Sequence, residues 1–302
     1  MGTMIQIKKH NNDIYRNKQY KEISCKKALN RLKRRIPYSW DLNIYRGCEH
    51  GCKYCYAIYS HDYLGSKDYY KDIYVKVNVV EQLEKQLSTP GWKRDIINIG
   101  GVTDSYQPVE KHYKLMPEIL KLLIKFKNPA IISTKSDLVL RDYDLINELS
   151  KLTYINVAAT VTTADEKLRE MIEPESVNSS RRFAMLKSFR KTNASVGLHV
   201  MPIIPFFTDG YKNIDLLFQM AKDSNVHYAL TGTLYLRGKT RAMFLAFMKE
   251  KFPHLYPDLI ALYKTGGANK KYKDSLYKIV NELRDKYSLS GNYSNIMKEK
   301  LN

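Results

Sequence analysis

The chain has 302 residues, of which 44% are hydrophobic, and this suits one large α/β domain or two small ones. No run of about 18 or more apolar residues occurs, and Met1–His10 lacks an apolar stretch. We therefore expect neither a membrane-spanning helix nor a secretory signal, and we predict a cytoplasmic protein. The formal net charge of +19 has two explanations, a composition rich in Lys, Ile, Asn and Tyr or a polyanionic partner such as nucleic acid.

Residues 1–40 are strongly basic. They hold eleven Lys and Arg residues but only two acids, Asp13 and Glu22. We predict a basic N-terminal extension over 1–40 with one short helix near Cys25–Arg34. This extension is either a solvated surface or an arm that binds nucleic acid.

Short apolar runs recur from residue 41 onward, and each is typical of a buried parallel strand. The six runs are Asp41–Tyr45, Ile96–Gly101, Ala130–Thr134, Ile155–Val161, Val196–Met201 and Tyr228–Leu234. Apolar stripes at helical spacing separate them, and we expect these stripes to pack in the core. The alternation predicts a parallel sheet with right-handed crossovers.

This α/β pattern fits a partial (β/α)6 TIM-like barrel over residues 41–251, and an open doubly wound sheet is the alternative. No Gly-rich phosphate fingerprint follows the first strand, which disfavours a dinucleotide-binding fold. Residues 252–302 are predicted to form a helical C-terminal tail. In a parallel barrel the functional site lies at the C-terminal ends of the strands.

Three of the four cysteines lie within eight residues, directly after the first predicted strand. Cys48, Cys52 and Cys55 have the spacing C-x3-C-x2-C, and Gly47 and Gly51 let the loop wrap closely. Cytoplasmic disulfides are rare, so this clustering favours a metal site. Three thiolates can hold three corners of a [4Fe–4S] cube, and the fourth iron is then left open for a catalytic ligand.

A structural zinc site is the alternative for this loop. Zinc requires four ligands. The fourth would have to be His50 or the distant Cys25.

The run "NIYRGCEHGCKYCYA" resembles the signature of the radical S-adenosylmethionine (radical SAM) superfamily, and in particular spore photoproduct lyase and its relatives. The resemblance covers roughly Lys21 to Pro253. It continues through the motifs "GGVTDSYQPVE", "ISTKSDLVLRD", "VAATVTT", "EPESVNSSRR", "MPIIPFFTD" and "LYLRG".

The resemblance implies a partial (β/α)6 barrel, a [4Fe–4S] cluster and SAM. In such enzymes the amino and carboxylate groups of SAM chelate the open iron. Reduction of the cluster then cleaves SAM to methionine and a 5′-deoxyadenosyl radical, which abstracts a hydrogen atom from the substrate. An electron donor such as flavodoxin or ferredoxin is the expected partner. The protein's part is to orient the cofactor and to keep the pocket dry.

The resemblance also places residues of this chain at SAM-contacting positions of the family. These are Tyr54, Gly100, Gly101, Thr103, Asp104, Lys135, Thr160 and Arg182. Tyr54 would lie beside the adenine, Asp104 would accept from the ammonium, and Arg182 would pair with the carboxylate.

Each assignment has a structural alternative. Tyr54 could simply pack in its loop, Asp104 could cap a turn and Lys135 could be solvated. Thr160 could pack its methyl group, and Arg181 competes with Arg182 for the carboxylate.

The residues expected nearer the substrate are Tyr56, Gln107, His199 and Arg237. Gln107, together with Glu110, is predicted to shape the pocket mouth. For His199 a position in the core is the alternative.

Spore photoproduct lyase uses a further cysteine as hydrogen donor after the second strand. This chain reads Gly100-Gly101-Val102-Thr103-Asp104 there, without a cysteine. We therefore do not expect thymine-dimer reversal by that route.

Three functions remain as hypotheses. The first is a radical SAM enzyme that acts on nucleic acid, in repair or modification. The second is a radical SAM enzyme that acts on a small molecule or peptide. The third is a non-catalytic module that binds metal or nucleic acid.

Overall fold

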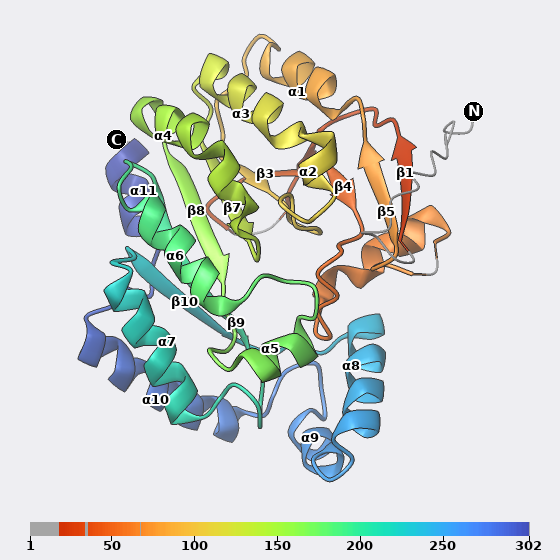
Figure 1. The fold of residues 1–302 in the computed structure, drawn as a ribbon, viewed down its shortest axis with the longest axis vertical. Coiled ribbons are helices and arrows are strands. Elements are labelled where there is room, and N and C mark those ends of the chain that lie inside the picture. Colours follow the sequence, from red (N-terminus) through yellow and green to blue (C-terminus); the bar gives the residue numbers. More distant parts are fainter. Residues whose placement is uncertain (1–17, 34–35, 67, 302) are drawn as a thin grey trace.

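A computed structural model describes residues 18–33, 36–66 and 68–301 (Figure 1). Its main sheet has the strand order β10-β9-β8-β7-β6-β3-β2 and remains open between β10 and β2. The strands are β2 (Leu29–Arg31), β3 (Trp40–Leu42), β6 (Ile97–Ile99), β7 (Ala130–Thr134), β8 (Ile155–Thr160), β9 (Ser195–Ile203) and β10 (Tyr228–Thr233). All neighbours pair in parallel except β2 and β3, which are antiparallel.

Six of these strands confirm the predicted parallel set and the partial barrel. The one clear difference is at the first strand, which was predicted to reach Tyr45. β3 ends at Leu42, and Tyr45–Arg46 forms a separate strand, β4. The chain therefore turns away from the barrel just before the cysteine loop.

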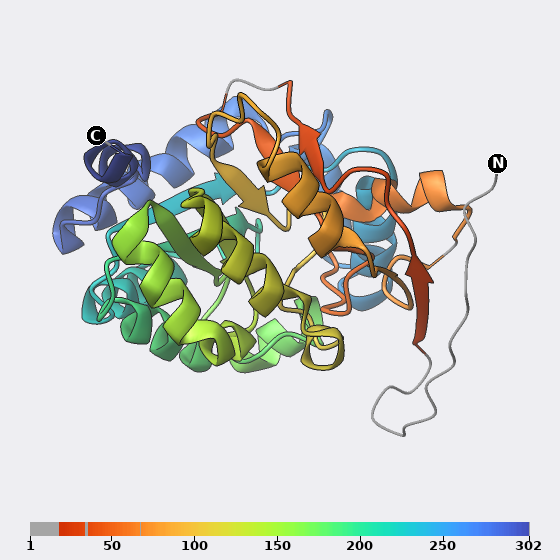
Figure 2. The same cartoon turned by 90° about the horizontal axis from the view of Figure 1, so that it is seen from above.

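Helices follow the strands and cover the outer side of the curved sheet (Figures 1 and 2). They are α1 (Val79–Leu87), α2 (Glu110–Tyr113), α3 (Leu115–Phe126), α4 (Tyr143–Leu152), α5 (Glu166–Ile172), α6 (Ser179–Phe189) and α7 (Tyr211–Asp223). The next helix, α8 (Gly238–Lys251), instead packs against residues 56–64, after the cysteine loop. Two 3-10 helices, η1 (Tyr56–Leu64) and η2 (Asp137–Asp142), follow the cysteine loop and β7. The predicted apolar stripes face the strands: Leu83, Ile119 and Leu186, for example, are fully buried in one core.

A small second sheet lies beside the barrel and was not predicted. Its strands are β1 (Gln19–Ile23), β5 (Asp72–Lys76) and β4, in the order β1-β5-β4. It joins the N-terminal segment to the cysteine loop.

The helix predicted near Cys25–Arg34 is wrong over the described residues 25–33, and the rest of that range lies outside them. The short strand β2 lies there instead. Two side chains, of α1 and of the residue before it, hold this backbone. The Asn78 amide oxygen accepts a hydrogen bond from the Cys25 N–H. The Gln86 amide oxygen accepts from the N–H groups of Ala28 and Leu29. These contacts, which are distant in sequence, replace the hydrogen bonds that a helix would make.

The C-terminal residues are helical, as predicted. They form α9 (Tyr256–Leu262), α10 (Lys270–Tyr287) and α11 (Ser294–Leu301). Within the described residues, no helix has both the length and the apolar character that crossing a membrane requires.

Candidate active site

The cysteine loop leaves β4 through a glycine that no other residue could easily replace. Gly47 has φ 84°, and an added Cβ would lie 2.7 Å from the Asp72 carbonyl oxygen. Gly51 also has a positive φ, of 68°. These two positions bend the loop back so that its thiols face the barrel.

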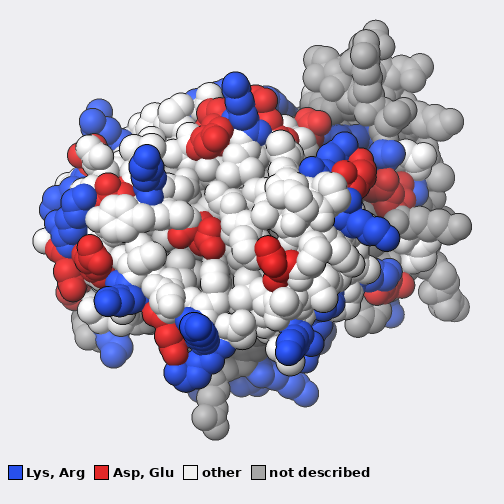
Figure 3. Space-filling model, turned by 90° about the horizontal axis from the view of Figure 1, so that it is seen from below, with Lys and Arg blue, Asp and Glu red and all other residues white. Residues whose placement is uncertain are grey.

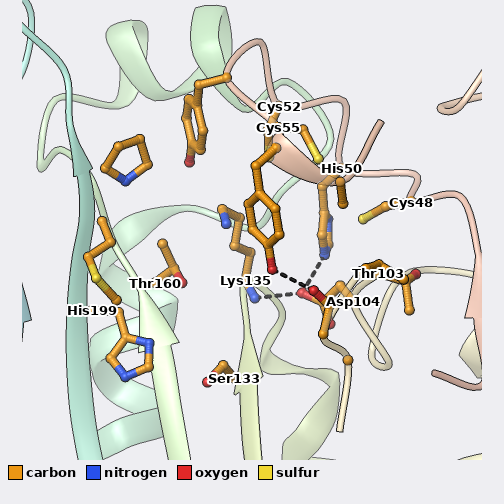
Figure 4. A pocket seen from close by; sticks show the side chains of 18 of the residues that line it. Cys48, His50, Cys52, Cys55, Thr103, Asp104, Ser133, Lys135, Thr160 and His199 are labelled. Atoms are coloured by element: carbon orange, nitrogen blue, oxygen red, sulfur yellow. Dashed lines mark hydrogen bonds and ion pairs between the residues drawn. The ribbon is translucent and has the colours of Figure 1, made fainter. Parts of the chain in front are cut away.

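Cys48, Cys52 and Cys55 line one pocket of about 620 Å³ at the C-terminal ends of the strands (Figure 4). All three are free thiols. Burial raises the pKa of each, and that of Cys52 to about 12. A bound cation would reverse this effect, because coordination deprotonates a thiol.

The donor geometry suits a cluster better than a single zinc ion. Within the described ranges, no three Cys, His, Asp or Glu side chains converge on one ion. Each thiolate of a cubane binds its own iron, so the sulfur atoms need not meet at one point.

Neither proposed fourth zinc ligand is available. Both ring nitrogens of His50 are engaged, Nε2 with Asp104 at 3.0 Å and Nδ1 with the Glu175 carbonyl at 3.4 Å. Cys25 is not among the residues that line the pocket.

Asp104 lies in the pocket wall, but its carboxylate is already filled by protein donors. It accepts from His50 Nε2, from Thr134 Oγ1 at 2.8 Å, and from the N–H groups of Tyr106 and Lys135 at 2.9 and 2.8 Å. Burial opposes its charge, but His50 and these donors hold its pKa at about 2. Because a carboxylate offers about four acceptor sites, Asp104 clamps the loop to β6 and β7, and the predicted bond to the SAM ammonium is replaced by this role.

Gln107 lies behind the cysteine loop and not at the pocket mouth, which corrects the sequence-based prediction. Its amide oxygen accepts from the Glu49 N–H at 2.8 Å, and its amide nitrogen donates to the Gly47 carbonyl and to Thr103 Oγ1. Thr103, which also lines the pocket, donates to the Gly47 carbonyl at 2.6 Å. Glu110 is fully buried as well.

Arg182 lies beneath the pocket wall, because its guanidinium is fully buried against Glu173 at 2.7 Å. It also donates to the carbonyls of Val177 and Thr160. No polar group of Arg182 lines the pocket, so the structure replaces the predicted direct contact with SAM by an indirect one. Its rival, Arg181, forms an exposed ion pair with Asp137.

Glu173 connects this buried pair to the loop. Its carboxylate accepts a hydrogen bond from the Tyr54 hydroxyl and one from Thr162 Oγ1. Burial alone would raise its pKa, but Arg182 and Lys135 lower it to about 2. Tyr54 itself lines the pocket.

Lys135 points into the pocket from the end of β7, with its Nζ 5.7 Å from the centre of the Tyr54 ring. No carboxylate in the described residues forms an ion pair with it. Burial disfavours its charge, yet Cys52 and Glu173 outweigh this and raise its pKa. It is therefore a cation available to a ligand.

The remaining predicted residues divide between two places. Gly100, Gly101, Thr160, His199 and Tyr56 all line the pocket, with Thr160 and His199 on the side opposite the cysteines (Figure 4). Burial, and then Lys135, lower the pKa of His199 to about 4, so its ring is neutral at pH 7. Tyr56 is 62% exposed and donates to the Gly101 carbonyl at 2.5 Å.

Arg237 lies outside this pocket, in an adjacent one.

Sequence reasoning missed several residues that support the loop. Tyr70 donates to the Cys52 carbonyl at 2.5 Å, and Tyr69 donates to the Val102 carbonyl at 2.7 Å. Thr240, in α8, donates to the Cys55 carbonyl at 2.9 Å. Only Glu173 carried a signal, as an acid inside one of the family-like motifs.

Comparison with known proteins identifies the class to which this arrangement belongs. The family model described as "Radical SAM superfamily" matches residues 42–218. The chain belongs to the radical SAM superfamily. It is accordingly a radical SAM enzyme that uses a [4Fe–4S] cluster and SAM.

Its curated relatives are uncharacterized proteins. One from Mycobacterium tuberculosis is 32% identical over 281 residues, covering 91% of this chain and 82% of the relative. Another from Methanocaldococcus jannaschii is 29% identical, with 88% and 93% covered.

Among solved structures, spore photoproduct lyase complexed with dinucleoside spore photoproduct matches with a TM-score of 0.65 and 14% identity. The match covers 87% of this chain and 78% of that one. At this level of identity it shows a shared fold.

The residues of the pocket fit both cofactors of a radical SAM enzyme, the [4Fe–4S] cluster and SAM. Three free thiols occupy one wall, and the Lys135 ammonium, which has no ion pair with the described residues, can meet a carboxylate. Thr233 also lines the pocket, and its Oγ1 is buried without a hydrogen-bond partner in the described chain. Such a group is suited to a polar ligand.

Proposed function

We propose that Cys48, Cys52 and Cys55 bind the cluster and that the same pocket holds SAM against it. The observation that carries this proposal is the convergence of the three thiols on one pocket at the C-terminal ends of the barrel strands. When bound, the cofactors supply reductive cleavage of SAM and a radical that abstracts hydrogen. Radical SAM enzymes generally need a reductant, and a flavodoxin or ferredoxin would serve here.

The chain's own residues position the SAM in this proposal. Lys135 pairs with the SAM carboxylate, since it is a half-buried cation that forms no ion pair with the described residues. Tyr54 presents its ring to the adenine, and Gly100 and Gly101 leave room for close approach. Arg182 and Asp104 hold the surrounding walls.

We further propose that the substrate is a nucleic acid. Asn98, Ser133, His199 and Thr233 bring polar groups to the pocket lining, beside the apolar Met201, Pro202 and Leu234. His199 is neutral, and its Nε2 is 3.3 Å from the Tyr228 hydroxyl, so its Nδ1 is left to bond the edge of a nucleobase. The fold shared with a lyase complexed with a dinucleoside supports the same substrate class.

The proposed reaction does not include a cysteine that returns hydrogen to the product. Cys25 is not among the residues that line the pocket, and the remaining three cysteines are the proposed cluster ligands. No thiol is therefore left to return a hydrogen atom.

The test of the radical SAM site uses single Cys→Ser variants. After anaerobic reconstitution, Cys48→Ser, Cys52→Ser and Cys55→Ser are each expected to lose most of the iron and at least about 100-fold of the reductive SAM cleavage, measured as 5′-deoxyadenosine by mass spectrometry. Cys25→Ser is the matched control and should keep both. Full cluster content in a loop variant would contradict the assignment.

The substrate is tested by isotope transfer. Deuterated DNA or RNA is incubated with the reconstituted enzyme, SAM and dithionite. Deuterium in the 5′-deoxyadenosine would support the nucleic-acid proposal. Transfer from a fractionated metabolite pool, with none from DNA or RNA, would instead favour a small-molecule substrate.

A further inference from the structure

A second pocket, of about 630 Å³, opens directly beside the proposed SAM pocket. Its walls are the start of α8 and the loop between α9 and α10. Tyr235 lines both pockets, so the two share a wall. A ligand that reaches both pockets would have to pass over Tyr235.

The second pocket is strongly cationic. Among the described residues that line it there is no Asp or Glu, whereas Arg237, Arg241, Lys264 and Lys273 are all cations. Within the described chain, Arg237, Lys264 and Lys273 form no ion pair. Several exposed lysines elsewhere, by contrast, have a carboxylate beside them, as Lys270 has Asp274. Unpaired cations gathered around a pocket are suited to an anion.

The backbone around this pocket is fixed in place. Arg241 donates to the carbonyls of Tyr263 and Thr265 at 2.9 and 3.2 Å, and the Leu236 N–H donates to the Gly266 carbonyl at 2.7 Å. A Cβ on Gly266 would lie 2.8 Å from the Tyr235 ring, so the loop lies flat against that ring.

The wall also includes Gly238, the first residue of the 14-residue helix α8, which has no side-chain cap. The backbone N–H groups at the start of α8 add to the positive potential of the second pocket.

Tyr235 offers an aromatic surface between the two pockets. Its side chain is 54% exposed, and the Arg237 guanidinium lies 5.9 Å from the ring centre. Exposed aromatic rings beside cationic grooves are the platforms on which unpaired bases stack.

We infer that the second pocket binds a backbone phosphate of a single-stranded nucleic acid, with a base stacked on Tyr235 and the neighbouring nucleotide in the SAM pocket. This inference rests on the proposed function. It does not rest on net charge. On the face in Figure 3, Lys and Arg lie mainly around the rim, and the middle is mostly uncharged with some acidic side chains. It concerns one pocket where cations lack acidic neighbours.

The test measures binding of a fluorescein-labelled pentathymidylate to the reconstituted protein at KCl concentrations from about 50 to about 200 mM. The variant Arg237→Gln/Lys264→Gln/Lys273→Gln removes three charges from the pocket. The control Lys151→Gln/Lys187→Gln/Lys222→Gln removes three exposed charges from α4, α6 and α7. Both triple variants change the net charge equally.

We expect the pocket variant to bind roughly 10-fold more weakly and to show a salt dependence shallower by ~0.7, since the pocket then no longer neutralises the one phosphate that it binds. The control should bind as the wild type does. Equally weakened binding in both variants would mean nonspecific attraction and would overturn the inference, as would unchanged binding in both.

Two further arms separate the sources of binding. Tyr235→Ala should weaken binding without changing the salt slope, and Tyr235→Phe should restore it, since the ring alone stacks. Inorganic phosphate or thymidine monophosphate that competes as strongly as the oligonucleotide would overturn the assignment to a strand. Reductive SAM cleavage by the wild type is measured separately, and its absence would reject the proposed function instead.

Discussion

At the scale of single residues, Glu173 is the buried charge on which the wall behind Tyr54 depends. Glu173→Gln leaves the fully buried Arg182 without a counter-charge. We expect a loss of about 3–5 kcal/mol in the free energy of unfolding, measured by urea denaturation, because an uncompensated charge is costly inside a protein. Glu148→Gln, on the exposed side of α4, should change it by less than about 0.5 kcal/mol. Similar values for both variants would contradict this role.

The pH dependence of the same residue follows from its lowered pKa. The pKa of Glu173 is about 2 in the folded protein against an ordinary value of 4.5. Its contribution is therefore complete above pH 4.5 and is lost as the pH falls toward 2, since the unfolded chain takes up the proton first. The difference in unfolding free energy between wild type and Glu173→Gln should shrink from about pH 6 to about pH 3. A difference that stays constant or grows would contradict it.

Site residues could be predicted where the chemistry is local. The thiol spacing of Cys48, Cys52 and Cys55 lies within one loop and is visible in the sequence. The engagement of Asp104 and Arg182 was not visible, because their partners His50 and Glu173 come from other segments. A motif indicates which residues gather, but the hydrogen-bond partners decide which of them remain free for a ligand.

At the scale of elements, the turn from β4 into the cysteine loop depends on Gly47. Gly47 and Gly91 have the same φ of 84°, but an added Cβ meets backbone only at Gly47. Gly91→Ala should therefore cost about 1 kcal/mol of unfolding free energy, the cost of the left-handed backbone alone. Gly47→Ala should cost at least about 2 kcal/mol more and lower the iron content. Equal costs would show that the close approach to Asp72 does not matter.

The elements themselves were predictable where apolar runs were long. β7, β8, β9 and β10 match their predicted runs within two residues at each end. The small sheet was not predictable, because β4 has only two residues and its position depends on pairing with β5. The 25–33 segment follows the same rule, since side chains of Asn78 and Gln86 decide its conformation.

At the scale of the whole molecule, an open barrel has two sheet edges that need cover. At one edge, the short strand β2 pairs antiparallel with β3 and is the last strand of the sheet. At the other, the Ala229 N–H of β10 donates to the Ser290 carbonyl at 2.8 Å, and Arg284 donates to the Ala229 carbonyl at 3.2 Å. Unpaired edges of this kind invite association between chains. The C-terminal segment therefore covers the β10 edge of the open barrel.

The segment Ser288–Asn292 covers the β10 edge, and a pair of truncations tests its contribution. A chain that ends at Tyr287 lacks the hydrogen bond to Ser290 and the buried Leu289, whereas one that ends at Asn292 keeps both. Both lack α11, so their difference isolates the segment Ser288–Asn292. We expect the shorter chain to be less stable by about 3 kcal/mol, from one edge hydrogen bond and one buried leucine. It should also show more high-molecular-weight species by size-exclusion chromatography with light scattering, because β10 is then uncovered. Equal monomer fractions and equal unfolding free energies for the two truncations would mean that the edge of β10 is protected by other contacts.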